Sequence, residues 1–422
     1  MKVINLFRFM ILLLPIWWFL GVTSVIFHVF TLLTFLALLR RKILIPKQLI
    51  PLFLFICVYV FSIMINYQEI PSDRLLASLY NLSYWVMGFL IIIIFYNISI
   101  EFNELLKLLN SFIVLGVICG LFSLIGSILF FKGYNEVTIT TPVSNLFPSF
   151  LKKAPLISSS FQFVLLREDY TIFGILRRGG LFFGWPVALG MTMGITISIT
   201  ILYYRIKNKI LKSIPFLILQ IIGLTYSLSR IATVGLVFSL FLIYYFTLRN
   251  RRIVVVNFLF LVMLLIFLFQ IPINLILKFE EFREGSAKTR INLYSYIIKS
   301  TLDEKPLFGY GVKPREENID IPLASHSTYL SNFFKAGFTG ISLLILFWFI
   351  VYKKWYRQIK IIKDDNLLLL HNFIGIIFIQ GLIWQLTEDI DATLVVPFLY
   401  FIIVGLILSF NKIKVRINYE TK

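Results

Sequence analysis

Residues 9–39 read FMILLLPIWWFLGVTSVIFHVFTLLTFLALL, a run without Lys, Arg, Asp or Glu that is punctuated by Gly21. About 20 consecutive apolar residues form a helix long enough to cross a bilayer. The run is too long for a single crossing and predicts two short membrane helices that meet at Gly21. If this first block lies in a membrane, later apolar runs of similar length are expected to be membrane helices as well.

Apolar runs of this kind recur along the whole sequence. The chain is 59% hydrophobic and 14% charged, whereas a soluble domain has about 25% charged residues. This composition excludes a soluble enzyme, a disordered chain and a coiled coil. After the first pair, further spans are predicted at 49–65, 75–96, 106–131, 183–203, 214–228, 231–248, 253–272, 333–352, 366–386 and 394–410.

The predicted fold is therefore an all-α polytopic membrane protein of about twelve transmembrane helices, with residues 1–422 forming one integral membrane domain. Two long polar segments, 132–182 and 273–332, are expected to be extracytoplasmic loops. Cys57 and Cys119 fall inside apolar runs and are interpreted as small buried hydrophobic residues.

The positions of the charges predict the orientation. If the N-terminus is cytoplasmic, the segments on that side hold 23 of the 40 Lys and Arg residues but only 5 of the 21 Asp and Glu residues. Short cytoplasmic loops of membrane proteins carry an excess of Lys and Arg. Both termini are therefore expected in the cytoplasm, with the long loops outside. The net charge of +19 is explained by topology and contact with membrane lipids, and no nucleic-acid partner is expected.

Signatures of nucleotide or metal chemistry are absent from the sequence: it has no phosphate-binding glycine-rich loop and no His-Glu-x-x-His. What remains are charged residues at the outer ends of spans, where charge is costly and often functional. Arg230 lies between two apolar runs, and Arg290 lies in a segment where Ile291, Tyr294, Ile298 and Leu302 predict an amphipathic helix on the membrane surface. Each arginine could bind a phosphate as a bidentate fork or anchor its helix to lipid headgroups.

Three further groups are candidates. His326 is the histidine nearest the outer loops, and a neutral imidazole can accept a proton from a hydroxyl. His28 and His371 are interpreted as packing residues. Arg177 and Arg178 stand before a predicted span and could bind phosphate or anchor the helix. Glu388 and Asp389 belong to the acidic stretch TEDID at 387–391, which could bind sugar hydroxyls or be a solvated turn.

At these residues the chain resembles the O-antigen ligase/polymerase family of bacterial envelope glycosyltransferases. Four segments carry the resemblance, in the family's order: RRGGLFFGWPVALG at 177–190, SLSRIATVG at 227–235, TRINLYSYIIKSTLDEKPLFGYG at 289–311 and HSTYLSNFFKAGFTG at 326–340. The last includes Tyr329 at an aromatic or acidic position of the family's pattern. The doubled arginine leaves open whether Arg177 or Arg178 corresponds, and the acidic position could be Glu388 or Asp389.

The resemblance implies a GT-C-like fold in the bacterial inner membrane and transfer of a glycan from undecaprenyl diphosphate to an acceptor hydroxyl. It places Arg230 and Arg290 at the departing diphosphate and His326 at the acceptor, as catalytic residues. Arg177, Arg178, Tyr329, Glu388 and Asp389 would bind substrate. Neither a metal nor a cofactor is implied. The partners implied are the lipid-linked glycan donor, a glycan acceptor, membrane lipids, a chain-length regulator and a flippase.

Within the family, a polymerase that joins repeat units of O-antigen or capsule is favoured. The first alternative is a ligase that moves a finished glycan to lipid A core, or a related protein O-glycosylating enzyme. A flippase or other transporter of lipid-linked glycans is the alternative from a different class. A flippase should carry charges mid-span along a central cavity, whereas here nearly all charges are predicted at span ends.

Overall fold

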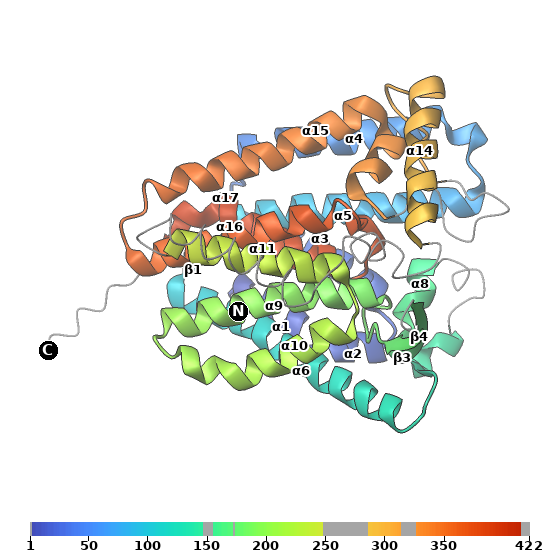
Figure 1. The fold of residues 1–422 in the computed structure, drawn as a ribbon. Coiled ribbons are helices and arrows are strands. Elements are labelled where there is room, and N and C mark those ends of the chain that lie inside the picture. Colours follow the sequence, from blue (N-terminus) through green and yellow to red (C-terminus); the bar gives the residue numbers. More distant parts are fainter. Residues whose placement is uncertain (1, 147–154, 172–173, 248–285, 314–325, 415–422) are drawn as a thin grey trace, which may run out of the picture.

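The computed structural model describes residues 2–146, 155–171, 174–247, 286–313 and 326–414. Most of these residues are helical, and the longer helices run alongside one another in one bundle (Figure 1). Among these described residues, six helices are long and apolar enough to cross a membrane: Lys47–Ile65, Arg74–Asn97, Phe102–Phe131, Pro186–Ile206, Thr328–Ile359 and Asp365–Trp384. Shorter apolar helices span Val3–Leu12, Thr23–Leu38, Ile210–Tyr226, Arg230–Leu242 and Val396–Lys412.

The helices follow one another in chain order with short connections at most points. Their bounds are α1 (Val3–Leu12), α2 (Leu14–Phe19), α3 (Thr23–Leu38), α4 (Ile50–Ile65), α5 (Ser72–Asn97), α6 (Phe102–Phe131), α8 (Pro155–Ser160), α9 (Pro186–Ile206), α10 (Ile214–Tyr226), α11 (Arg230–Thr247), α14 (Ser286–Glu304), α15 (Thr328–Ile359), α16 (Asp365–Trp384) and α17 (Val396–Ser409).

The prediction of a helical, polytopic membrane protein is confirmed. Each span predicted after residue 40 coincides with an apolar helix except 253–272, which lies outside the described residues. The segment before Gly21 forms two helices, α1 and α2, because the chain also breaks at Leu13. The predicted break at Gly21 is also present, because Gly21 has a φ of +68° and separates α2 from α3. This left-handed conformation costs a glycine little and ends the preceding helix. The prediction for Cys119 is confirmed, whereas Cys57 is exposed on α4, since that helix turns one side away from the protein.

Helix α17 lies at the centre of the bundle. All of its residues from Val396 to Ser409 are buried, as expected for a helix that is apolar on every side. It packs most closely on α5, and also on α15 and α16. Glycines allow this approach: a Cβ at Gly88 would lie 2.4 Å from Phe401, and one at Gly381 would lie 1.9 Å from Tyr400. Small residues at helix contacts are typical of membrane bundles.

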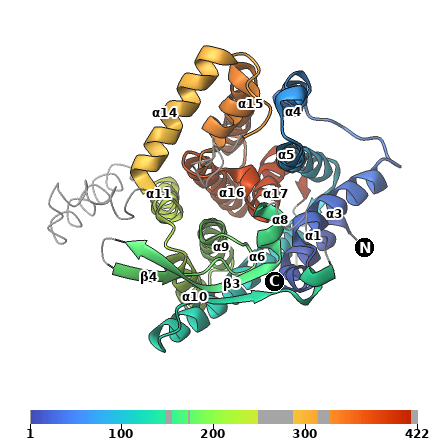
Figure 2. The same ribbon diagram turned by 90° about the vertical axis from the view of Figure 1, so that its right-hand side faces the viewer.

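A small antiparallel sheet covers one end of the bundle, and the all-α prediction did not include it. Its strands are β2 (Val137–Thr140), β3 (Gln162–Thr171) and β4 (Gly174–Arg178), in the order β2-β3-β4. We call the end that carries this sheet and α14 the loop end (Figure 2). At the opposite end, β1 (Ile100–Glu101) pairs in parallel with β5 (Ile413–Lys414).

Helix α14 lies across the loop end instead of running along the bundle (Figure 1). The predicted helix is therefore present, and two stripes of its surface are apolar. Ile298 and Leu302 are 42% and 44% exposed, as a membrane-facing stripe would be. Leu293 and Ile297 form a second, buried stripe, and Ile297 packs with Phe334 of α15. Periodicity alone could not show that the helix is fixed to the protein by this second stripe.

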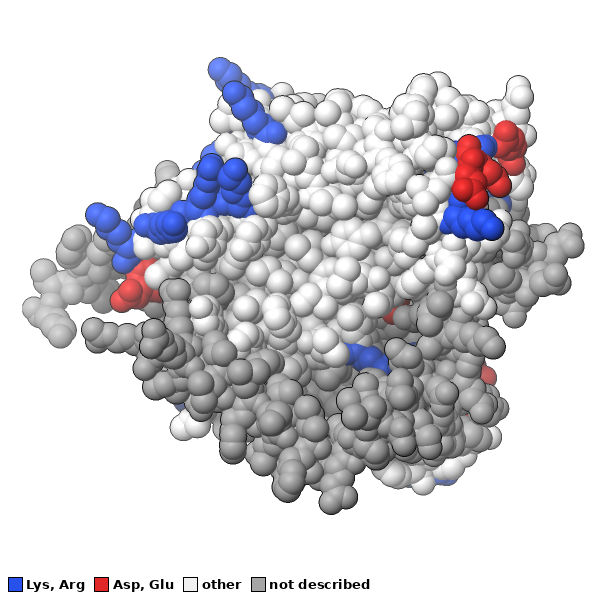
Figure 3. Space-filling view, turned by 45° about the horizontal axis from the view of Figure 1, so that its top comes forward, with Lys and Arg blue, Asp and Glu red and all other residues white. Residues whose placement is uncertain are grey.

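On the face drawn in Figure 3, most charged side chains lie at the two ends, and a wide area without charge separates them in the upper part of the view. Lys and Arg predominate at one end, and acidic and basic residues are mixed at the loop end. This distribution agrees with the asymmetry that the sequence predicted. An uncharged band is the surface that the hydrocarbon layer of a membrane requires.

Candidate functional site

His326 stands at the loop end, directly before α15. Its backbone is left-handed, with a φ of 73°, a conformation that costs a non-glycine residue energy and often marks a functional position. The next residue, Ser327, caps α15 by accepting a hydrogen bond from the Leu330 amide at 3.4 Å. The Tyr294 hydroxyl of α14 donates to the His326 carbonyl at 2.8 Å. Two helices therefore fix the backbone that carries the imidazole.

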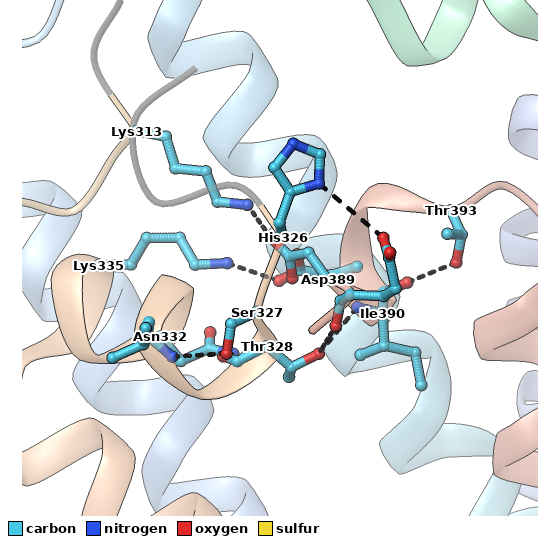
Figure 4. Close-up of polar contacts among 12 residues, drawn as sticks. Lys313, His326, Ser327, Thr328, Asn332, Lys335, Asp389, Ile390 and Thr393 are labelled. Carbon is cyan, nitrogen blue, oxygen red and sulfur yellow. Dashed lines mark hydrogen bonds and ion pairs between the residues drawn. The ribbon is translucent and has the colours of Figure 1, made fainter. Parts of the chain in front are cut away.

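The imidazole faces a carboxylate. His326 Nδ1 lies 4.0 Å from Glu388 Oε2 (Figure 4), and the two side chains are 29% and 13% exposed. This distance is too long for a hydrogen bond, but it allows a charge interaction if the ring is protonated. The structure thus brings together two of the residues that the sequence singled out, from positions 62 apart in the chain.

Glu388 belongs to a short connection between α16 and α17, and we call residues 387–391 the acidic turn. The first turn of α15 is hydrogen-bonded to it (Figure 4). The Thr328 amide donates to the carbonyl oxygens of Gln385 at 2.9 Å and Glu388 at 3.1 Å. The Thr328 hydroxyl donates to the Glu388 carbonyl and accepts from the Ile390 amide, each at 2.9 Å. These bonds set where the Glu388 backbone lies relative to His326.

Two buried ion pairs lie behind the acidic turn. Lys335 Nζ of α15 is 2.6 Å from Asp391 Oδ2, and these side chains are 0% and 1% exposed. The Trp85 indole of α5 donates to the same Asp391 oxygen at 2.7 Å. Lys313 pairs with Asp389 (Figure 4), with side chains 6% and 3% exposed. Asp389 is thus held by Lys313, and Glu388 is the acidic residue that faces His326.

The buried cations control the protonation of Asp391. Burial by itself would raise its pKa, but the ammonium groups of Lys335 and Lys313 outweigh this effect and hold the pKa of Asp391 below its ordinary value. Asp391 is therefore ionised at neutral pH. Sequence reasoning missed Lys335, although a lysine within an apolar span was the available signal; Lys313 carried no comparable signal.

Residues 306–311 fit into a break in α15. At Gly337 the helix leaves helical geometry, with φ 65° and ψ −166°. Amides of Tyr310 and Gly311 donate to the carbonyls of Phe334 at 2.8 Å and Lys335 at 2.9 Å. In return, the amide of Phe338 donates to the Pro306 carbonyl at 2.8 Å.

Two glycines make this contact possible. A Cβ at Gly309 would lie 2.3 Å from the Phe334 carbonyl oxygen, and one at Gly337 would lie 2.4 Å from the Leu307 carbonyl group. Two of the segments that carried the family resemblance, 289–311 and 326–340, therefore form one unit. This unit connects the helix of Arg290 to the helix that follows His326.

Arg230 is the first residue of α11, and its side chain is half-buried. One turn later, a Cβ at Gly235 would lie 2.8 Å from Trp384 Nε1 at the end of α16. The carbonyl oxygen of Gln385, the next residue after Trp384, accepts a hydrogen bond from the Thr328 amide. Arg230, the first residue of α11, therefore lies at the same end of the bundle as His326 and the acidic turn.

The other predicted arginines also lie at the loop end. Arg177 and Arg178 are in β4, opposite Glu168 and Arg167 of β3. Arg178 is partly buried, whereas the side chain of Arg177 lies outside the described part of the chain. Arg290 belongs to the N-terminal part of α14, and its side chain is likewise outside the described part.

The β4 segment is joined to the turn before Arg230. A Cβ at Gly179 would lie 2.7 Å from the Tyr226 ring, and the Tyr226 hydroxyl donates to the Leu165 carbonyl at 2.6 Å. A Cβ at Gly190 would lie 2.5 Å from Ser229. The predicted order of motifs therefore corresponds to segments that contact one another in space.

An apolar groove of about 460 Å³ lies between α15 and α16. Phe349 and Leu386 are more than half exposed, so the groove is open at the side of the bundle. Its lining includes Tyr329, three residues after His326, and Leu386, two residues before Glu388. One end of the groove therefore lies near the candidate site. The remaining lining residues are Ile345, Trp348, Phe349, Tyr352 and Leu382.

His28 and His371 do not belong to this site. The His28 ring packs 4.6 Å from the Tyr84 ring, and His371 is buried with its Nε2 2.9 Å from the Trp355 carbonyl oxygen. Their interpretation as packing residues agrees with these contacts.

Comparison with known proteins supplies one result. Residues 215–345 match a protein-family model described as O-antigen ligase. A search of curated proteins finds no match. The matched range includes Arg230, α14, His326 and the broken part of α15, whereas the acidic turn with Glu388 lies beyond its end.

Proposed function

We propose, on the premise that this match supports an O-antigen ligase/polymerase-type family, that the chain transfers glycans from a polyprenyl-diphosphate carrier at the loop end. Members of the family are glycosyltransferase-like enzymes, either ligases or polymerases. The observation that carries the proposal is the approach of Glu388 to His326 at 4.0 Å, at the end of the bundle where Arg230 begins α11.

In the proposed reaction, the acceptor hydroxyl oxygen bonds to the anomeric carbon of the donor sugar while the bond from that carbon to the diphosphate oxygen breaks. His326 accepts the hydroxyl proton, an effect typically worth about 100- to 10,000-fold in rate. Attack opposite the leaving group inverts the anomeric centre. The nearby Glu388 carboxylate stabilises the imidazolium that forms, so the pair acts as a general base with an electrostatic partner.

The departing diphosphate gains negative charge as the bond breaks. Guanidinium groups placed before the reaction stabilise that charge, and losing one such donor typically costs about 100- to 1,000-fold. Arg230 and Arg290 are assigned to this role, with Arg177 or Arg178 in support. The activated lipid carrier stores the energy for the transfer, so the reaction needs no nucleotide.

The groove between α15 and α16 is assigned to the isoprenoid chain of the donor. It is apolar, opens sideways toward the membrane, and ends at Tyr329 and Leu386 beside the site. A donor with its diphosphate near Arg230 can therefore keep its hydrocarbon chain in the lipid layer. Replacing Phe349 with Gln should raise the KM for a long-chain donor more than for a short-chain donor, as measured by initial rates.

A polymerase that joins lipid-linked oligosaccharide repeat units, in O-antigen or capsule assembly, is the function that we favour. A ligase that transfers glycan to lipid A core is the second candidate, because the matching family model carries the description of a ligase. Both use the same donor chemistry and differ in the acceptor. A chain-length regulator and a flippase are the expected protein partners in the inner membrane.

The purified protein should be incubated with a single lipid-linked repeat unit, and the products separated on a gel. A ladder from the wild type that is lost in His326→Ala supports a polymerase that uses this histidine. His28→Phe is the matched control, because it retains an aromatic ring against Tyr84. Transfer only after lipid A core is added identifies a ligase. No product in either assay would contradict the enzyme and favour a transporter.

A further inference from the structure

The two ion pairs behind the acidic turn are deeply buried, and their contribution to the stability of the fold does not by itself explain their presence. Lys335 and Asp391 are 0% and 1% exposed, and Lys313 and Asp389 are 6% and 3% exposed. Removing charges from water is expensive, and well-packed apolar side chains often give equal or greater stability at such positions. The residues around Lys335 in α15 are mostly apolar, so the fold could have used an apolar residue here.

The ion pairs fix the position of the acidic turn. Asp389 directly follows Glu388, and Asp391 follows after Ile390. Lys335 holds one from α15, and Lys313 holds the other from the segment that follows residues 306–311. Ion pairs with fixed geometry allow the turn only one position, whereas apolar packing tolerates small displacements.

The partners of these groups are themselves fixed. The Arg74 guanidinium of α5 donates to the Lys313 carbonyl, with Nε at 2.9 Å. The Trp85 indole, also of α5, donates to Asp391 at 2.7 Å. The Ser62 hydroxyl of α4 donates to the Lys335 carbonyl at 2.7 Å. The two lysines and Asp391 that hold the acidic turn are therefore themselves bonded to α4 and α5.

We propose that Lys335–Asp391 and Lys313–Asp389 are positioning pairs that set the distance between Glu388 and His326. The inference rests on the proposed function, in which these two side chains handle the acceptor proton. The positioning residues touch no reacting atom. They act through the backbone of the acidic turn, whose Glu388 carbonyl is bound by Thr328.

The test uses the full-length protein with the double substitution Lys335→Met and Asp391→Asn. This variant removes both charges and retains an amide oxygen for the Trp85 indole. A second variant, Lys313→Met with Asp389→Asn, probes the other pair. Lys2 pairs with Glu101 at 3.0 Å and with Glu104 at 2.8 Å, remote from the loop end. The control is therefore Lys2→Met with Glu101→Gln and Glu104→Gln.

Three measurements distinguish positioning from stability. The thermal midpoint of each double variant should equal or exceed that of the wild type. Hydrogen exchange should become faster in peptides that contain the amides of Thr328 and Ile390, which bond across this contact. Turnover should fall about 100-fold, the effect expected when a reacting group is displaced by about 1 Å, while the KM for the donor changes little. The control variant should match the wild type in all three.

Stable variants with unchanged exchange, or with unchanged turnover in an active enzyme, would overturn the inference. So would failure of both double variants to fold, because the pairs would then be required for stability. If the wild type itself shows no transferase activity, the proposed function fails, and the exchange measurement alone decides whether the pairs position the turn.

Discussion

At the scale of single residues, His326 depends on hydrogen bonds to its backbone as well as on its ring. Its left-handed conformation, φ 73°, is held where Tyr294 donates to its carbonyl at 2.8 Å. Tyr294 follows Arg290 by one helical turn, so one side chain connects the backbone of the proposed base to the helix of a proposed phosphate ligand.

Tyr294→Phe should therefore reduce turnover without unfolding the protein. A neutral hydrogen bond contributes a net of about 0.5–1.5 kcal/mol, which corresponds to a fall of roughly 2- to 10-fold. Initial rates of glycan transfer provide the measurement. Tyr296→Phe, at a tyrosine of the same helix that is 45% exposed, is the control and should leave the rate unchanged.

Asp391 gives a prediction for pH. Its pKa is held below the ordinary value of 3.8 by the two lysines, so its ionised form stabilises the fold fully above that pH and loses this contribution as the pH falls through the lowered pKa. Asp391→Asn leaves Lys335 buried without a charged partner, which should cost about 3–5 kcal/mol.

That deficit should shrink below pH 3.8, as wild-type Asp391 becomes protonated. It should also shrink as the pH becomes alkaline, because a buried lysine without a carboxylate partner can lose its proton in the variant. Chemical unfolding of wild type and variant in detergent at a series of pH values measures it. A deficit that stays unchanged below pH 3.8 would contradict the assignment of an ionised Asp391 in the native protein.

At the scale of elements, the contact between residues 306–311 and the break in α15 depends on two glycines. Gly309 has a φ of +67°, and an added Cβ would lie 2.3 Å from the Phe334 carbonyl oxygen. No flexible side chain can move to relieve this clash, because the obstructing atom is backbone.

Gly309→Ala should therefore separate the segment from α15, lower the thermal midpoint and abolish glycan transfer. Gly133 provides a matched control: its φ is +86°, but an added Cβ meets nothing within 4 Å. Gly133→Ala should show only the cost of a left-handed alanine, about 1–2 kcal/mol, with activity retained. Equal effects of the two substitutions would mean that backbone conformation, not the contact, matters at Gly309.

Most of the helices could be predicted from the sequence, because a membrane helix needs only a long apolar run and a break such as Gly21. The sheet could not. Strands β2, β3 and β4 are stabilised by pairing between segments such as Val137–Thr140 and Gln162–Thr171, which no single-segment pattern reveals. The buried stripe of α14 was hidden for a related reason, since its partner Phe334 lies in another helix.

The candidate site was predicted in part. Glu388 and His326 were both recognisable as polar residues next to apolar spans, but their approach to each other depends on the fold. Asp389 looked equivalent to Glu388 in the sequence, and only the position of Lys313 distinguishes them. The left-handed conformation at His326 has no sequence signal, because it is imposed by the contacts of Tyr294 and Thr328 with neighbouring elements.

At the scale of the whole molecule, the two ends of the described chain meet. Lys2 forms an ion pair with Glu101 at 3.0 Å, and Lys414 pairs with the same Glu101 in the β1–β5 register. These contacts lie at the end of the molecule opposite the loop end. Basic residues predominate at that opposite end (Figure 3). Both ends of the described chain are therefore on the same side, which the sequence predicts to be cytoplasmic.

A labelling experiment tests this orientation. In a background of Cys57→Ala and Cys119→Ala, Lys2→Cys should react with a membrane-impermeant thiol reagent only after the membrane is opened. Glu136→Cys, at an exposed position of the loop end, should react in sealed cells as well. Labelling in the reverse order would show that the loop end faces the cytoplasm, where a lipid-linked donor at the outer face could not reach it.

The central place of α17 bears on how the protein is made. The helices that pack around it, α5, α15 and α16, all precede it in the chain. They leave the ribosome before the segment that fills the middle of the bundle has been synthesised. Until then their inner faces must contact one another or lipid, so the final arrangement of the earlier helices can form only after residue 409 has entered the membrane. Premature termination before α17 should therefore leave an inserted but unassembled protein, open to membrane proteases.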